Sequence, residues 1–243
     1  MDHAAALTEQ NRLLAELVHD RAPDAAVPTC PGWTLQQLVR HVGRGDRWAA
    51  TIVRTGEFVD PREVPGGKPG DDVTGWLRES PRTLLDAVAE TGPDVPVWTF
   101  LGPRPAAWWI RRRLHESTVH RADAALALGE AYAIDAAVAA DGVSETLALT
   151  AERPPAEAPP LPAGTVLHLH ATDDGLGEAG EWMVRGTDDG GVAWEHGHGK
   201  GAAAVRGPAA DLLLAVHRRI PASAVQVLGD AAVFDTWLAR TVF

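Results

Sequence analysis

The sequence has little cysteine, little lysine and no long apolar run. Its single cysteine, Cys30, has no partner for a disulfide within the chain. No stretch approaches the roughly 20 apolar residues that a membrane-spanning helix needs. The first twenty residues are amphipathic and acidic, unlike the basic and then apolar start of a signal peptide. We therefore expect a cytoplasmic protein without a membrane segment.

Positive charge is scarce too, because 22 Lys and Arg residues oppose 33 Asp and Glu residues, giving a formal net charge of -11. Such a chain repels polyphosphate, so we expect no nucleic acid partner. Two catalytic patterns are missing as well. The stretch GGKPG lacks the earlier glycine of a phosphate-binding loop, where Arg62 stands. Neither Ser117 nor Ser144 has the pair of flanking glycines of a hydrolase nucleophile elbow.

Prolines mark the expected domain boundary. Five of them fall in the segment RPPAEAPPLPAG at 153–164, which neither a helix nor a central strand accommodates. We interpret residues 154–163 as a semi-rigid linker between a helical domain, 1–153, and an α+β domain, 164–243. Apolar residues recur at helical spacing before this segment, whereas short alternating stretches and glycine turns follow it.

The helical domain should contain five helices. The pattern predicts them at 3–20, at 35–55 after an N-cap at Thr34, from Asp71 or Asp72 to 91, from Pro105 to 129, and at 135–152. In the second domain we predict strands at 165–173, within 181–197 on both sides of an Asp-Gly-Gly turn, and at 202–207 and 225–230, with helices at 208–220 and 230–241. That order is typical of a small α+β unit with a mostly antiparallel sheet.

The stretch LHESTVHR places Glu116 and His120 four residues apart, on one face of the fourth predicted helix. A carboxylate and an imidazole are both ligands of Zn²⁺, and a catalytic zinc usually has three protein ligands. His41, at the edge of the apolar face of the second helix, is the candidate third ligand if the two helices are neighbours in a bundle. Taken alone, the pattern also fits a solvated surface pair and a core histidine.

Other residues offer competing sites. His168 and His170 point to one face of a predicted strand, and His196 and His198 flank a glycine, so the two pairs could bind a metal by themselves. We favour a polar, solvent-facing side of the strand, because neither pair has a carboxylate or cysteine within its own strand to complete it. Cys30 precedes a helix start, which can lower the pKa of a thiol, but we interpret it as a small packing residue.

Two motifs resemble a known family. VPTCPGWTLQQLVRHVGRGDRWA and, later, WWIRRRLHESTVHRADAALALG are similar to the mycothiol-dependent maleylpyruvate isomerases, part of the DinB-like metalloenzyme superfamily. The resemblance covers essentially the whole chain. It implies a four-helix DinB-like bundle, followed by a smaller α+β domain that resembles a sterol-carrier fold and contains VRGPAADLLLAVHRR. It also implies that His41, Glu116 and His120 are the metal ligands.

The resemblance further implies a divalent metal, Zn²⁺ by its ligands, and mycothiol as a thiol cosubstrate. A metal-activated thiolate would add to a small-molecule electrophile, either as an S-transferase or, if elimination follows, as a cis-trans isomerase. A metal-dependent hydrolase and a non-catalytic ligand-binding module with a structural metal are the alternatives. Arg206 and Arg219 are both candidates for the C-terminal-domain arginine that the family places near its active site. Arg112 is either an anion-binding or a surface residue, and Asp123 either orients His120 or is solvated.

Overall fold

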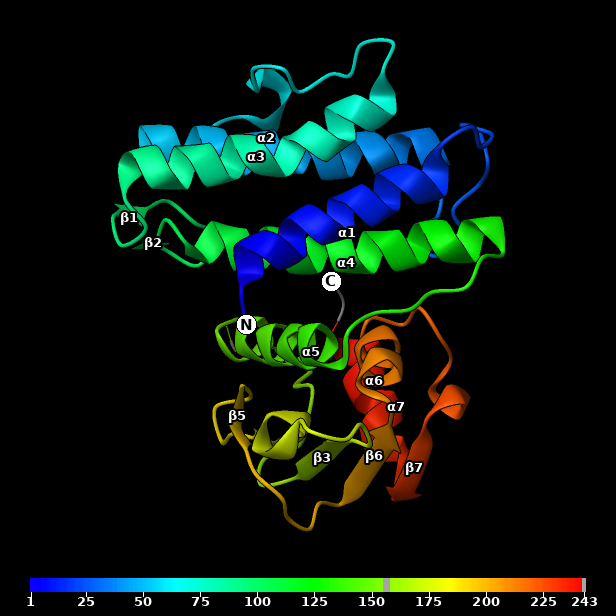
Figure 1. Ribbon diagram of the computed structural model, residues 1–243. Coiled ribbons are helices and arrows are strands. Elements are labelled where there is room, and N and C mark those ends of the chain that lie inside the picture. Colours follow the sequence, from blue (N-terminus) through cyan, green and yellow to red (C-terminus); the bar gives the residue numbers. More distant parts are fainter. Residues whose placement is uncertain (155–157, 242–243) are drawn as a thin grey trace. The chain divides into compact units, whose positions relative to one another are not determined.

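Four long helices form the first part of the chain. The computed structural model describes residues 1–154 and 158–241. Its bundle consists of α1 (His3–Val18), α2 (Leu35–Thr55), α3 (Val73–Thr91) and α4 (Trp108–Leu128) (Figure 1). Two-residue strands β1 (Pro96–Val97) and β2 (Arg104–Pro105) pair just before α4, and the short 3-10 helix η1 (Pro61–Glu63) lies between α2 and α3. The predicted helical bundle is confirmed.

Local chemistry sets the ends of these helices. Thr34 caps α2 in a capping box with Gln37, and Gly56 ends the helix in the left-handed conformation at φ 76°. Asp72 accepts a hydrogen bond from the third residue of α3. The predicted start of α4 at Pro105 was wrong by three residues. Pro105 lies in β2 and pairs with Pro96, so the helix begins at Trp108.

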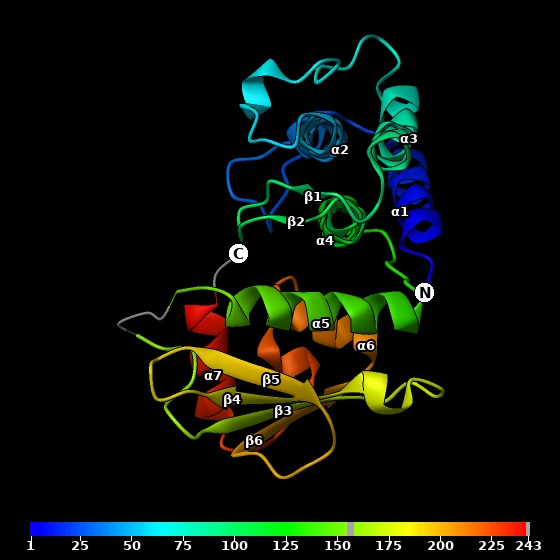
Figure 2. The same ribbon diagram turned by 90° about the vertical axis from the view of Figure 1, so that its left-hand side faces the viewer.

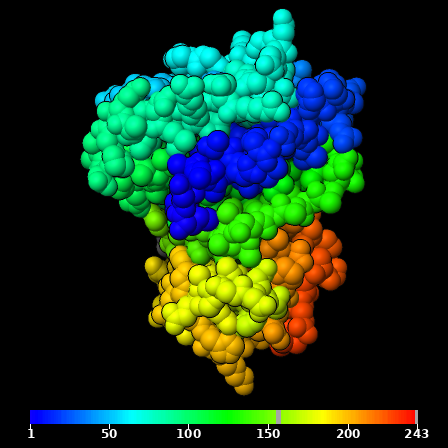
Figure 3. Space-filling model, in the orientation of Figure 1, coloured from blue at the N-terminus to red at the C-terminus, as the bar shows by residue number. Residues whose placement is uncertain are grey.

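The bundle is held by apolar faces that match the helical period. Leu14 of α1, Leu38 and Val42 of α2, and Leu77 of α3 are completely buried in one cluster. Gly43 lets the ring of Trp76 approach α2 closely, because a Cβ there would lie 2.3 Å from the ring. On the face drawn in Figure 3, α1 (blue) runs obliquely between α3 above and α4 below. Each helix in the described part of the chain is too short or too polar to span a bilayer.

The second part contains a five-stranded sheet. Its strands are β3 (Val166–Ala171), β4 (Glu181–Gly186), β5 (Val192–His196), β6 (Ala203–Gly207) and β7 (Gln226–Gly229), in the order β5-β4-β3-β6-β7. Only the β3–β6 pair is parallel among these, as the mostly antiparallel prediction requires. Helices α5 (Ala136–Ala151), α6 (Ala209–Val216) and α7 (Ala231–Arg240) lie on one face of the sheet (Figure 2). The 3-10 helices η2 (Gly177–Gly180) and η3 (Ala222–Ala224) lie in its connections.

The fifth predicted helix, α5, packs with the sheet and not with the bundle. The chain divides into two compact units, Met1–Tyr132 and Ala133–Phe243, so the division precedes α5, whereas the sequence analysis placed the boundary after it. Val143 and Leu147 are buried in the same core as Leu167 and Trp182. The Trp182 indole nitrogen also donates a hydrogen bond to Ser144 at 2.9 Å. An apolar face of α5 therefore completes the core of the second unit.

The proline-rich segment is not simply a spacer. Residues 155–157 of the predicted linker lie outside the described residues. Beyond them, Leu161 is completely buried in the core of the second unit. The carbonyl oxygen of Pro159 accepts a hydrogen bond from Arg240 at 2.8 Å. The later half of the segment therefore packs on the sheet domain.

Candidate metal site and substrate cavity

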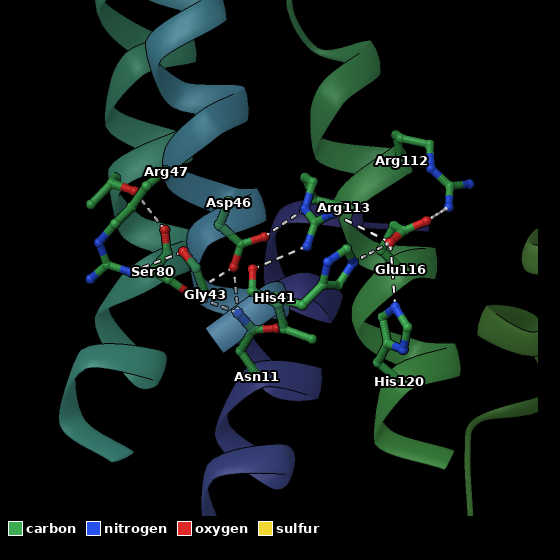
Figure 4. Close-up of polar contacts among 12 residues, drawn as sticks. Asn11, His41, Gly43, Asp46, Arg47, Ser80, Arg112, Arg113, Glu116 and His120 are labelled. Atoms are coloured by element: carbon green, nitrogen blue, oxygen red, sulfur yellow. Dashed lines mark hydrogen bonds and ion pairs between the residues drawn. The ribbon is translucent and has the colours of Figure 1, made fainter. Parts of the chain in front are cut away.

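Helices α2 and α4 bring the three predicted metal ligands together. His41 lies on α2, and Glu116 and His120 lie one turn apart on α4 (Figure 4). The Nε2 atoms of His41 and His120 lie 3.4 and 3.6 Å from Oε2 of Glu116. One donor atom from each residue lies within 4.8 Å of the others. Two imidazoles and a carboxylate converging in this way fit the donor set of a catalytic Zn²⁺ site.

Asp123 orients His120 from behind. Its carboxylate is fully buried and lies 2.9 Å from Nδ1 of His120. Thr29 and Cys30 donate hydrogen bonds to the same carboxylate at 2.6 and 3.4 Å. A carboxylate on Nδ1 holds a proton there, so that Nε2 faces Glu116 and provides the lone pair for a metal once the ring is neutral, the arrangement of metal-binding histidines.

Cys30 is more than the packing residue that the sequence suggested. It joins His120 and Asp123 in a second group of closely spaced donor atoms. The segment that leads into α2 thus supports the same histidine that faces His41. The ring of Trp33, from this segment, lies near both imidazoles. Its centroid is 5.0 Å from that of His41 and 6.1 Å from that of His120, on which it stacks. These contacts fix the orientation of both imidazoles.

The charges around the three residues favour an anionic carboxylate and one neutral imidazole. Burial would raise the pKa of the Glu116 carboxyl, but Arg112, the two histidines and Arg113 hold it well below its usual value. Burial lowers the pKa of His41. Burial would also lower the pKa of His120, but the hydrogen bonds to Asp123, Cys30 and Glu116 raise it to about 10. When no metal is bound, the raised pKa favours a protonated His120. Its positive charge then lies between the carboxylates of Asp123 and Glu116.

A buried polar network supports the site and connects all four helices (Figure 4). Asp46 of α2 is completely buried and accepts hydrogen bonds from Asn11 of α1 and Ser80 of α3, each at 2.6 Å. Arg113 of α4 donates to the same carboxylate at 2.8 Å and lies 3.6 Å from Glu116. The sequence analysis did not predict this network. The position of Asp46 on the apolar face of its helix could have indicated a buried carboxylate with polar partners.

A cavity of about 220 Å³ opens beside His41 and Glu116. Trp48, Phe100 and Trp109 provide an aromatic wall. Arg112 also lines this cavity and forms an ion pair with Glu116, so it is not a surface arginine. Arg44 lines the cavity as well, and no ion pair with it occurs among the described residues. The cavity thus offers an apolar surface with a cationic rim.

The other candidate residues lie in the second unit. His168, His170 and His198 gather around Glu181, whereas His196 is outside this group. The expectation of a simple solvent-facing strand is wrong for His168, which is only 4% exposed. Arg206 is exposed on β6, and Arg219 follows α6 and donates to the carbonyl oxygen of His217. Neither arginine is singled out by these contacts.

The fold and the site define a general class of protein. Its members join a helical bundle, which has a histidine–carboxylate cluster beside a cavity, to a small α+β unit. The family model described as the mycothiol maleylpyruvate isomerase (MDMPI) N-terminal domain matches residues 4–125. A second family model, described as the MDMPI C-terminal domain, matches residues 137–236. The chain therefore belongs to the mycothiol maleylpyruvate isomerase family, a family of enzymes. The second match begins within α5, in line with the division of the structure.

Solved structures agree with this fold. A crystal structure of mycothiol-dependent maleylpyruvate isomerase is 20% identical, with a TM-score of 0.61 and coverage of 93% of this chain and 90% of that chain. A histidine-to-alanine mutant of mycothiol-dependent maleylpyruvate isomerase is 18% identical, with a TM-score of 0.59 and the same coverage. At this identity the likeness concerns the fold alone. A comparison with curated proteins found no match.

Proposed function

We propose that this chain is a metal-dependent enzyme that uses a low-molecular-weight thiol, mycothiol, to attack a small electrophilic molecule. The reaction is either a cis-trans isomerisation or an S-transfer. The observation that carries the proposal is the convergence of His41, Glu116 and His120 beside a cavity, in a chain of this family. We propose these three residues as the ligands of a divalent cation, Zn²⁺ by donor type. A cytoplasmic location without membrane or nucleic acid partners stays the expectation from the sequence.

Each neighbouring residue has a distinct task in this proposal. A cation bound there would stabilise the anionic form of an incoming thiol at neutral pH. Asp123 holds His120 in the tautomer that presents Nε2. Arg112 and Arg113 keep the Glu116 carboxyl ionised and restrict its position. Trp33 packs on both imidazoles, which limits the rotation of their rings.

The cavity selects the electrophile. Its aromatic wall suits an apolar or conjugated carbon skeleton. Arg44 at the rim is placed to bind an anionic group of that molecule, such as a carboxylate. Replacing Arg44 by Gln should then raise KM for an anionic electrophile and leave KM for the thiol unchanged, as steady-state kinetics can measure. Equal changes in both constants would contradict this assignment.

The metal is tested by analysis of the purified protein. Wild-type protein should hold one divalent ion per chain more than the triple variant His41→Ala, Glu116→Ala, His120→Ala. His19→Ala is the matched control, since His19 is an exposed histidine of the same unit and pairs only with exposed Asp20 among the described residues. Equal metal contents in the wild type and the triple variant would refute the site.

The reaction class is tested by the need for thiol. The proposal requires that loss of an electrophile depends on mycothiol and disappears in the triple variant. Conversion of a cis to a trans double bond with thiol regenerated indicates an isomerase, whereas a stable thioether indicates an S-transferase. Metal-dependent hydrolysis without thiol would replace the proposal by the hydrolase alternative. Binding of metal with no turnover of electrophiles would favour the non-catalytic module.

A further inference from the structure

A second histidine–carboxylate cluster lies in the sheet domain, away from the helices that cover the sheet. His168 and His170 alternate with Leu167 and Leu169 along β3, so the leucines enter the core and the histidines point to the opposite face. In the antiparallel β3–β4 ladder, Glu181 lies directly opposite His170. Strand pairing therefore supplies the carboxylate that neither histidine pair has in its own strand.

The segment after β5 adds a third imidazole. Gly197 and His196 both contact the carbonyl oxygen of Glu181, with hydrogen bonds of 3.3 and 3.0 Å. This anchors the chain so that His198 reaches back over the sheet. The centroid of the His198 ring lies 5.1 Å from that of the His168 ring and 6.0 Å from that of the His170 ring.

All three imidazoles point at one carboxylate. Nε2 of His168 lies 2.6 Å from Oε2 of Glu181, and Nδ1 of His170 lies 2.7 Å from Oε1. Nδ1 of His198 lies 3.1 Å from Oε1 of the same residue. One donor atom of each of the four residues lies within 4.8 Å of every other. Four ligands at about 2 Å from a tetrahedral cation are roughly 3.3 Å apart, so a cation could replace these hydrogen bonds with small shifts.

Burial distinguishes this cluster from a chance surface group. The His168 side chain is 5% exposed and that of Glu181 is 16% exposed, while His198 is 73% exposed. His168 and Glu181 are thus held inside the domain, and the exposed His198 lies over them on the segment after β5. Three neutral imidazoles and one carboxylate are ligands that Zn²⁺ and related transition-metal ions accept, whereas Mg²⁺ and Ca²⁺ prefer oxygen.

We propose that His168, His170, Glu181 and His198 form a second transition-metal site, which binds Zn²⁺ through four protein ligands and ties β3, β4 and the segment after β5 together. Four protein ligands leave no open position on a tetrahedral ion, so the role is structural. This site lies entirely within the second unit and is independent of the proposed catalytic site on α2 and α4.

The test uses the full chain and Zn²⁺ as the probe. Because Zn²⁺ binding to the folded state stabilises it, added Zn²⁺ should raise the melting temperature of the chelator-treated protein. His198→Ala removes the exposed ligand without opening the core and should weaken the corresponding Zn²⁺ affinity by at least about 10-fold. His19→Ala is the control, because His19 is an exposed imidazole of the first unit that pairs only with exposed Asp20 among the described residues. The two variants should differ in metal content by one ion per chain.

The result separates the two sites. The triple variant of His41, Glu116 and His120 should keep one Zn²⁺, which Glu181→Gln removes, and His198→Ala should keep thiol-dependent turnover. If that triple variant does not fold, a metal content of two ions in the wild type and one in His198→Ala gives the same answer. Equal Zn²⁺ content and equal melting shifts for wild type, His19→Ala and His198→Ala would overturn the proposal and leave the cluster as an ion-pair network only.

Discussion

At the residue scale, the candidate catalytic site depends on which nitrogen of His120 holds a proton. Asp123 accepts from Nδ1, and Glu116 lies on the Nε2 side, so the ring is held between two carboxylates. A metal-binding histidine has the same partner on its far nitrogen. The arrangement therefore suits both the protonated, metal-free state and the neutral, metal-bound state.

Asp123→Asn should lower the affinity of the bundle site for Zn²⁺ by roughly 10–100-fold, because it removes the charge that orients and polarises His120. A competition assay with a chelating dye would measure this. Asp24→Asn changes an exposed aspartate in the same unit and should leave the affinity unchanged. An unchanged affinity in Asp123→Asn would show that Asp123 supports folding alone.

Zn²⁺ binding at the bundle site should release about one proton near neutral pH. His120, with a pKa raised to about 10, is protonated there and must become neutral to bind, whereas His41, with a lowered pKa, is already neutral. The affinity should therefore rise with pH. Calorimetry in buffers of different ionisation enthalpy counts the protons, in His198→Ala protein so that one site is observed. Release of none would contradict the assigned state of His120.

At the element scale, the bundle is fixed by one buried carboxylate as well as by its apolar faces. Asp46 has a partner on each of the other three helices, from Asn11, Ser80 and Arg113. Because Arg113 also lies near Glu116, the network sets the position of α4 relative to α2 at the site. Without this network, apolar packing alone would restrict the rotation of each helix about its axis less strongly.

Asp46→Ala should destabilise the protein by about 3–5 kcal/mol, since it leaves the buried guanidinium of Arg113 without its carboxylate partner. The free energy of unfolding can be measured by urea denaturation. Asp86→Ala provides the comparison, because Asp86 forms an exposed ion pair with Arg82 at 3.6 Å, and its loss should cost about 1 kcal/mol or less. Similar losses in both variants would argue against the network's role.

At the scale of the whole molecule, α5 decides where the chain can be divided. Its apolar face contributes Val143 and Leu147 to the core of the sheet domain. The expected boundary at the prolines would remove this helix and expose that core. The division before α5 keeps the core complete.

A fragment of residues 133–243 should fold cooperatively, whereas a fragment of residues 164–243 should not, because it lacks α5 and the buried Leu161. Circular dichroism during thermal unfolding would distinguish them by the presence or absence of a sharp transition. A sharp transition in the shorter fragment would mean that α5 is dispensable and would restore the boundary at the prolines.

Local patterns in the sequence determined the elements and the candidate ligands. Helical periodicity, caps and turn residues located the helices and strands, and the i, i+4 spacing placed Glu116 beside His120. These features depend on neighbours along the chain, so they can be inferred without the fold. The position of His41 at the edge of the apolar face of its helix made it the candidate third ligand, and the motifs that resemble the family then implied the same residue.

Only the tertiary structure decided which distant residues meet. The position of Asp46 among four helices, the hydrogen bond from Thr29 to Asp123, and Glu181 opposite His170 depend on helix packing and strand register. The assignment of α5 to the sheet domain depends on which core its apolar face fills. Such contacts join residues far apart in the chain, and no local spacing specifies them.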